Sequence, residues 1–145
     1  MTSTSHPIDT APIRVFLSYA RTDAKNVEKL RNYLGFEPRI RVVSPDSLTS
    51  GQAWASQLKH AIEDCDVFVV VISPTSVASP NVLYELGAAW GMGKPILPVT
   101  TQVYSGLNLP LDLKDLPSVS IGELEDPDAL RGIIKQIETI GLSAR

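Results

Sequence analysis

Residues 67–87 read VFVVVISPTSVASPNVLYELG, and this stretch decides the fold. Its first six residues, Val67 to Ile72, form an unbroken apolar run, which is typical of a strand buried on both faces of a parallel sheet. Ser79 is a favoured N-terminal cap of a helix, and Pro80 suits the first helical position. The stretch therefore predicts a buried strand, a turn and a helix, which presents one carboxylate, Glu85, just beyond the carboxyl end of the strand.

Apolar runs and amphipathic spacings alternate along the rest of the chain. They predict strands at residues 13–18, 39–43, 66–72, 95–99 and 119–121, with helices between them and a last helix at residues 127–140. Asp23 is expected to cap the first helix and Gly35 to end it. This alternation predicts an α/β fold: a flavodoxin-like three-layer sandwich with a central parallel five-stranded sheet, of strand order 2-1-3-4-5, and helices on both faces.

The length and composition of the chain limit the classes of function that it can have. The 145 residues, 43% of them hydrophobic, suit one compact domain at residues 13–142, and the Thr, Ser and Pro content of residues 1–12 predicts a disordered lead-in. A net charge of -3 leaves no basic surplus to bind a nucleic-acid backbone. Val67 to Ile72 is far shorter than the roughly 20 residues of a membrane-spanning helix. We therefore expect a cytoplasmic protein without direct contact to nucleic acid or membrane.

The sequence carries no recognisable metal or dinucleotide motif. Neither histidine has a partner at metal-ligand spacing, and Cys65, the one cysteine, precedes a buried strand as an inert core thiol would. Gly87, Gly91 and Gly93 fall within and after a helix rather than at its start, so they form no dinucleotide fingerprint. Close helix packing and a C-terminal cap account for these glycines.

In a sheet of this order, ligands bind beyond the carboxyl ends of the strands, where the strand order reverses between the first and third strands. Ser18 to Arg21 follow the first strand, and Ser73 to Glu85 follow the third. We expect these two segments to converge on one crevice, with Glu85 above it. The alternative for Glu85 is a solvated glutamate on the surface of its helix.

Four segments resemble, in their order and spacing, the Toll/interleukin receptor (TIR) domains: Val15–Asp23, Asp46–Gly51, Asp64–Leu86 and Lys94–Val99. The resemblance covers residues 13 to about 140 and leans towards the bacterial, NAD-cleaving members. In the enzymatic branch of this family, the glutamate at the position of Glu85 is catalytic for cleaving NAD between nicotinamide and ribose. The resemblance thus implies NAD as the substrate, and it implies no cofactor.

Further substrate-binding residues are expected beside Glu85. By analogy with the family, Ser18 and Tyr19 line the same edge of the crevice. The planar guanidinium of Arg21 suits the pyrophosphate of the substrate, and a surface arginine near Asp23 is an equal alternative.

Two more candidates lie on helices. Trp54 matches a family position whose apolar side chain lines the substrate pocket, although a tryptophan on the apolar face of a helix is also plain core. Asn81 lies one helical turn before Glu85, on the same face of the helix, at a position where the family often carries an aromatic residue. Asn81 either hydrogen-bonds the substrate or is an exposed helix asparagine.

The implied reaction suits a site with one carboxylate. Nicotinamide leaves NAD from a pyridinium and departs neutral, so no general acid is needed, unlike in ordinary glycosidases. A carboxylate stabilises the oxocarbenium-like transition state and hydrogen-bonds the ribose hydroxyls. We therefore predict an NAD glycohydrolase that forms nicotinamide and ADP-ribose or a cyclic isomer, in bacterial antiphage defence signalling.

Family precedent also implies a partner, a second TIR domain whose Asp46–Gly51 loop completes the site of its neighbour. A sensor or effector protein or domain is expected as well, because the 145 residues contain no recognisable sensor. Two alternatives stay open. One is a non-catalytic module that signals through TIR–TIR contacts. The other is a nucleotide-processing protein, because Asn81–Gly87 also resembles nucleoside deoxyribosyltransferases.

Overall fold

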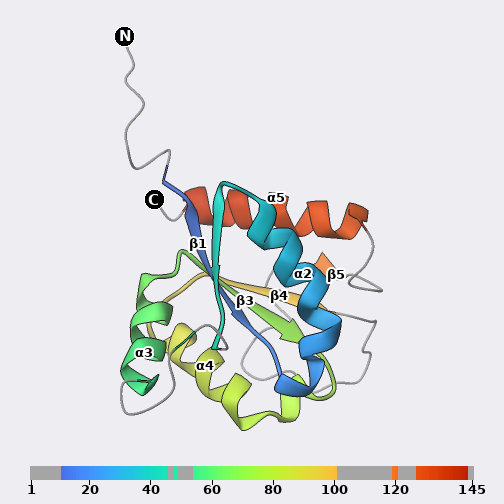
Figure 1. The fold of residues 1–145 in the computed structure, drawn as a ribbon. Helices are drawn as coiled ribbons and strands as arrows, with labels where there is room; N and C mark the ends of the chain where they lie inside the picture. The colour runs from blue at the N-terminus through green and yellow to red at the C-terminus, as the bar shows by residue number, and fades with distance from the viewer. Residues whose placement is uncertain (1–10, 46–47, 49–53, 101–118, 121–126, 144–145) are drawn as a thin grey trace.

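The computed structural model describes residues 11–45, 48, 54–100, 119–120 and 127–143. Strands and helices alternate along the chain, as Figure 1 shows. In chain order they are β1 (Ile13–Ser18), η1 (Arg21–Asp23), α2 (Ala24–Phe36), β2 (Ile40–Val43), α3 (Trp54–Asp64), β3 (Val67–Ile72), η3 (Ser76–Ala78), α4 (Pro80–Gly91), β4 (Ile96–Thr100), β5 (Val119–Ser120) and α5 (Pro127–Ser143), where η marks a short 3₁₀ helix. The predicted lead-in at residues 1–12 falls mainly outside the described residues.

The strands form one parallel sheet in the order β2-β1-β3-β4-β5. The predicted order is confirmed for β2-β1-β3-β4, which build a flavodoxin-like α/β fold. The strand β5 contributes only two residues at the edge of the sheet, where Val119 pairs with Val99. Ile121, the expected last residue of this strand, lies outside the described residues.

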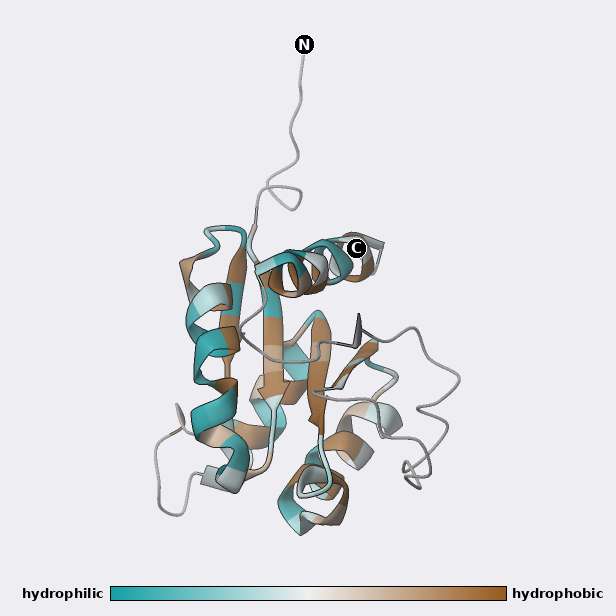
Figure 2. Ribbon diagram, turned by 90° about the vertical axis from the view of Figure 1, so that its right-hand side faces the viewer, coloured by the Kyte–Doolittle hydropathy of each residue, from teal (hydrophilic) through white to brown (hydrophobic). Residues whose placement is uncertain are grey.

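Side chains that alternate along the strands fill two cores, one on each face of the sheet. Val15 and Leu17 of β1 pack with α2 and α5, whereas Phe16 packs with α3 and α4. The ring of Phe16 stacks on that of Phe68 in β3, with their centroids 5.4 Å apart. Figure 2 shows the strands as a hydrophobic centre between helices that carry hydrophilic residues outward. The described helices therefore cover both faces of the sheet.

The start and end of α2 differ from expectation. Asp23 precedes α2, but its side chain makes no capping hydrogen bond, because its carboxylate accepts a hydrogen bond from Ser73 instead. Gly35 lies inside α2, which continues to Phe36 and leaves the helical conformation only at Glu37. Asp23 therefore occupies the predicted N-cap position without a side-chain capping hydrogen bond, and the prediction that Gly35 ends the helix is wrong.

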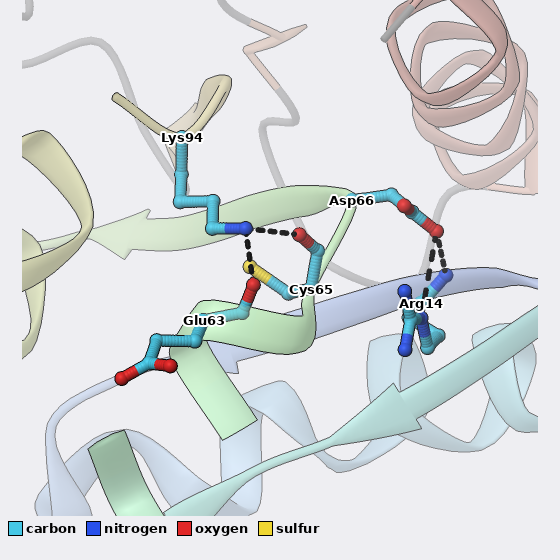
Figure 3. A network of polar contacts seen from close by, with 5 residues as sticks. All are labelled: Arg14, Glu63, Cys65, Asp66 and Lys94. Carbon is cyan, nitrogen blue, oxygen red and sulfur yellow. Dashed lines mark hydrogen bonds and ion pairs between the residues drawn. The ribbon is translucent and has the colours of Figure 1, made fainter. Parts of the chain in front are cut away.

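Polar contacts hold the amino ends of β1 and β3 (Figure 3). The ammonium group of Lys94 donates to the backbone carbonyl of Glu63 and, at 3.2 Å, to that of Cys65, at the C-terminal end of α3. Asp66 Oδ2 accepts a hydrogen bond from the backbone N–H of Arg14 at 2.8 Å. These contacts lie at the opposite edge of the sheet from the carboxyl ends, where the sequence predicts the ligand site.

Candidate active site

Local sequence signals place α4 and its carboxylate. Ser79 Oγ accepts a hydrogen bond from the backbone N–H of Val82, and Pro80 is the first residue of α4, so the helix begins as predicted. Its end also lies where predicted, because Gly93 adopts a φ of 71°, a left-handed conformation that favours glycine. Glu85 therefore lies in the second turn of a helix whose two ends are set by local chemistry.

Glu85 is buried, with only 3% of the residue exposed. Its Oε1 accepts a hydrogen bond at 2.7 Å from Oγ of Ser18, which is itself buried at the last position of β1. Hydrogen bonds to carboxylates are strong, and a low-dielectric interior strengthens them further. The alternative of a solvated surface glutamate is therefore wrong for Glu85.

The Ser18–Glu85 pair lies where the strand order reverses. The strand β1 has β2 on one side and β3 on the other, and Ser18 is level with Val70 of β3. In open parallel sheets, ligands bind outside the carboxyl ends of the strands at this point. The structure thus brings two of the predicted site residues together at the predicted edge of the sheet.

A second polar network joins the segments that follow β1 and β3. Ser73 Oγ donates to Asp23 Oδ2 at 2.5 Å and accepts from the backbone N–H of Ser76 at 2.9 Å. The backbone N–H of Ser73 donates in turn to Ser76 Oγ at 2.8 Å. Sequence reasoning misses this network. The one signal for it is a pair of serines three residues apart directly after a buried strand, because serines favour such side-chain turns.

Tyr19 does not join Ser18, although they are adjacent in sequence. Successive side chains of an extended chain point to opposite sides. Tyr19 packs in the core beneath α2 and α5, where its hydroxyl accepts a hydrogen bond from Arg31 Nη1 at 3.1 Å. The structure therefore separates the side chain of Tyr19 from the Ser18–Glu85 pair. Arg21 lies in η1 with an exposed side chain.

Trp54 and Asn81 differ in burial. Trp54 begins α3 and is partly buried against the core beneath α3 and α4. Asn81 lies in the first turn of α4 with an exposed side chain. Of the Asp46–Gly51 loop, only Leu48 is described, and it packs against the same core as Trp54. The contribution of this loop to the site stays a prediction.

The described residues contain no cluster of three His, Cys, Asp or Glu side chains that would hold a metal ion. Burial raises the pKa of the Cys65 thiol to about 11, and this effect outweighs the positive charge of Lys94, which lowers the pKa. Cys65 is therefore protonated at neutral pH and is a poor nucleophile. None of the helices in the described ranges combines the length and the apolar content that crossing a membrane requires.

Comparison with known proteins identifies a family that matches this chain. A model of the TIR domain matches residues 15–134 of the chain. No curated protein matches its sequence. Among solved structures, the TIR domain of a Toll-related receptor from Hydra magnipapillata is similar with a TM-score of 0.67 at 21% identity, and the match covers 86% of this chain and 97% of that one.

Two further solved structures have the same fold and belong to other classes of protein. A CMP N-glycosidase from Clostridium botulinum is similar with a TM-score of 0.58 at 20% identity, over 84% of this chain and 98% of that one. A 2-desoxiribosyltransferase from Leishmania mexicana has a TM-score of 0.60 at 15% identity, over 88% of this chain and 98% of that one.

Proposed function

Because the chain belongs to the TIR domain family, which includes NAD-cleaving enzymes, we propose that it is an NAD glycohydrolase with Glu85 as its catalytic carboxylate. The observation that carries the proposal is the buried Glu85, held by Ser18 Oγ at 2.7 Å at the carboxyl end of β1. Burying a carboxylate costs free energy, and such groups are concentrated at functional sites.

In the proposed reaction, the bond between ribose C1′ and the pyridinium nitrogen of NAD breaks, and its electron pair passes to the nitrogen. Nicotinamide leaves as a neutral molecule, so its departure needs no proton donor. Positive charge develops on the ribose, where the carboxylate of Glu85 stabilises it. Water, or a nucleophilic atom of the same substrate, then attacks C1′ and gives ADP-ribose or a cyclic isomer. A proton is released in the hydrolysis.

Ser18 acts through Glu85 as a positioning residue. Its hydroxyl restricts the orientation of the carboxylate before the substrate binds, which makes the negative charge preorganised. Arg21 is the proposed contact for the pyrophosphate, and Trp54 and Asn81 are the other proposed binding residues. Tyr19 has no place in this group, because its side chain packs in the opposite core.

Assembly is part of the proposal. The Asp46–Gly51 loop of a neighbouring copy would complete the site, and a sensor or effector partner would trigger assembly. Activity per molecule is then expected to rise with protein concentration. Constant activity per molecule over a wide dilution series would contradict the requirement for assembly. Loss of cellular NAD, or the nucleotide made from it, is the proposed route to a role in antiphage defence.

A nucleotide N-glycosidase or deoxyribosyltransferase is the second candidate. The similarity in fold to a CMP N-glycosidase and a 2-desoxiribosyltransferase favours it. Both names imply a broken bond between a sugar and a base. A neutral base is a poorer leaving group than nicotinamide, because it requires protonation as it departs. A single carboxylate without a proton donor is therefore sufficient for cleavage of NAD, and for this reason NAD is our first candidate substrate.

Chromatography of three parallel reactions separates the candidates. The full chain, at high concentration, is incubated with NAD, with CMP, and with a deoxynucleoside plus a free base. The proposal expects nicotinamide from NAD and no release or exchange of bases in the other two reactions. Base release or exchange with NAD left intact would favour the second candidate. No product in any reaction would favour a non-catalytic interaction module.

A further inference from the structure

A groove runs along the outer edge of the sheet, between α2 and β2. The strand β2 is the edge strand, and none of the described strands pairs with its outer side. The groove has a volume of about 530 Å³, which is a usual size for a ligand-binding pocket. Its walls include Arg31 and Gly35 of α2 and Ile40, Arg41 and Val42 of β2. We call this surface the β2 groove.

The β2 groove follows the backbone of the edge strand. Ile40, Arg41 and Val42 are consecutive, and all three line it. Side chains alternate between the two faces of a strand, so a groove lined by three consecutive residues lies along the edge of the strand.

Backbone groups alternate as well. The carbonyl of Arg39 accepts a hydrogen bond from the N–H of Ile13 in β1 at 2.7 Å, so Arg39 turns towards β1. In a parallel ladder every second residue bonds to the neighbouring strand, so Arg41 also turns towards β1. Val42, between two such residues, therefore turns its N–H and C=O towards the groove. Outward backbone groups of this kind are a template for pairing with another chain.

The β2 groove is basic, although the chain has a net charge of -3. Arg31 and Arg41 line the groove, and no Asp or Glu is among its described lining residues. Guanidinium groups bind carboxylates through paired hydrogen bonds. Val42 and Gly35 leave apolar surface between the two arginines. The groove is therefore complementary to an extended segment in which acidic and apolar residues alternate.

An exposed aromatic residue lies beside the groove. Phe36, the last residue of α2, follows the lining residue Gly35 and is 87% exposed. Aromatic residues and arginine are enriched in protein–protein interfaces, whereas Asp and Glu are depleted. An apolar anchor next to two arginines and an open strand edge favours a protein segment over a small anion such as free phosphate.

We propose that the β2 groove binds an extended acidic segment of a partner protein, which adds a strand beside β2. Main-chain hydrogen bonds to Val42 supply affinity, and Arg31 and Arg41 select acidic side chains. The groove is joined to the candidate site, because Arg31 Nη1 donates to the hydroxyl of Tyr19 at 3.1 Å, and Tyr19 directly follows Ser18. The inference does not rest on the proposed reaction, since binding is measured without NAD.

Selection from a phage-displayed library of random octapeptides tests the inference. The full chain is expected to enrich peptides that alternate acidic residues with β-branched or aromatic ones. Fluorescence anisotropy then measures the affinity of a selected peptide. Arg41→Glu should weaken binding by about tenfold or more, because it replaces a guanidinium with a repelling carboxylate.

Two further measurements separate binding in the groove from a loss of folding. Gly35→Leu fills the groove and should also weaken binding, while it raises the melting temperature because leucine is a better helix former than glycine. Methylation of alternate backbone nitrogens of the peptide tests strand addition directly. Of the two alternating sets of nitrogens, only the set that faces β2 should abolish binding when methylated.

Lys135→Glu is the matched control. Lys135 is exposed on α5 and does not line the groove, so this variant makes the same change of charge elsewhere and should bind the peptide as the wild type does. The inference is overturned if no peptide is enriched, if the enriched peptides are not acidic, or if Arg41→Glu and Lys135→Glu bind equally. Equal effects of the two methylated sets would also overturn it. Loss of peptide binding as the protein concentration rises would assign the groove to a second copy of the chain instead.

Discussion

Asp23 and Ser73 join the two segments that flank the proposed site, because Ser73 Oγ donates a hydrogen bond to Asp23 Oδ2 at 2.5 Å. Asp23 ends η1, and Ser73 directly follows β3. Their bond therefore spans the point at which the strand order reverses, close in the chain to Ser18. The side chain of Asp23 therefore joins the two segments instead of making the capping hydrogen bond that the sequence predicts, although Asp23 is still the N-cap residue of α2.

Removing the acceptor should destabilise the fold. Asp23→Ala leaves a partly buried hydroxyl without its acceptor, and we expect the free energy of unfolding to fall by about 1–3 kcal/mol. Urea denaturation measures this change. Asp23→Asn keeps an acceptor oxygen at the same place and should retain most of the stability. Equal losses in the two variants would contradict a role for the hydrogen bond.

Ser18→Ala should lower the rate of nicotinamide release by about tenfold or more, with little change in KM, because the carboxylate of Glu85 loses the group that orients it. Steady-state kinetics at a fixed protein concentration measure both constants. In a Glu85→Gln background the same change should have no further effect, since the two residues act as one unit. Independent, multiplying effects would show that Ser18 does not act through Glu85.

The stability of the chain should depend on pH through Cys65. Burial raises the pKa of its thiol from 9.0 to about 11, so the unfolded chain loses this proton at a lower pH than the folded chain does. The contribution of the protonated Cys65 thiol to the free energy of unfolding is fully present below pH 9.0 and is lost as the pH rises towards 11. Urea denaturation of the wild type and Cys65→Ala measures the difference. That difference should be constant below pH 9.0 and shrink above it, and a constant difference at all pH values would contradict the burial effect.

Lys94→Met should cost about 1 kcal/mol of stability, because the carbonyls of Glu63 and Cys65 at the end of α3 lose a cationic donor. Lys59→Met is the matched control. In the described part of the chain, Lys59 forms an exposed ion pair with Glu63, at 3.9 Å, and such pairs contribute little. Chemical denaturation compares the two variants. A cost for Lys59→Met as large as that for Lys94→Met would show that charge alone explains the effect.

Local patterns were sufficient to predict the elements around the candidate site. The side chains of the unbroken apolar run Val67 to Ile72 are all removed from water only if both faces of the strand are buried. This single requirement places β3 in the middle of the sheet. Ser79 and Pro80 supply the cap and the first turn of α4 through contacts within a few residues. Because the helix start is local, the position of Glu85 just beyond β3 could also be predicted.

Contacts between distant residues could not be predicted in the same way. The partner of Asp23 lies 50 residues away, and the capping signal of Asp23 is as good as that of any other helix start. The side chain of Tyr19 packs on the other face of the sheet from that of Ser18, because the chain is extended where β1 ends. The residue types at this point do not indicate that local geometry. A Cβ atom added to Gly87 would meet no atom of the described chain within 4 Å, so the described residues do not show the close packing expected of this glycine. Such openness is also a property of the folded molecule.

The release of nicotinamide from NAD by the wild type, Glu85→Gln and Glu28→Gln, at equal and high concentration, tests the central claim most directly. Glu28 is an exposed glutamate of α2, so Glu28→Gln removes the same charge away from the site. Glu85→Gln should retain the folded far-ultraviolet spectrum and lose activity by about 100- to 1000-fold, whereas Glu28→Gln should equal the wild type. Equal rates for Glu85→Gln and the wild type would contradict the assignment of Glu85 as the catalytic carboxylate.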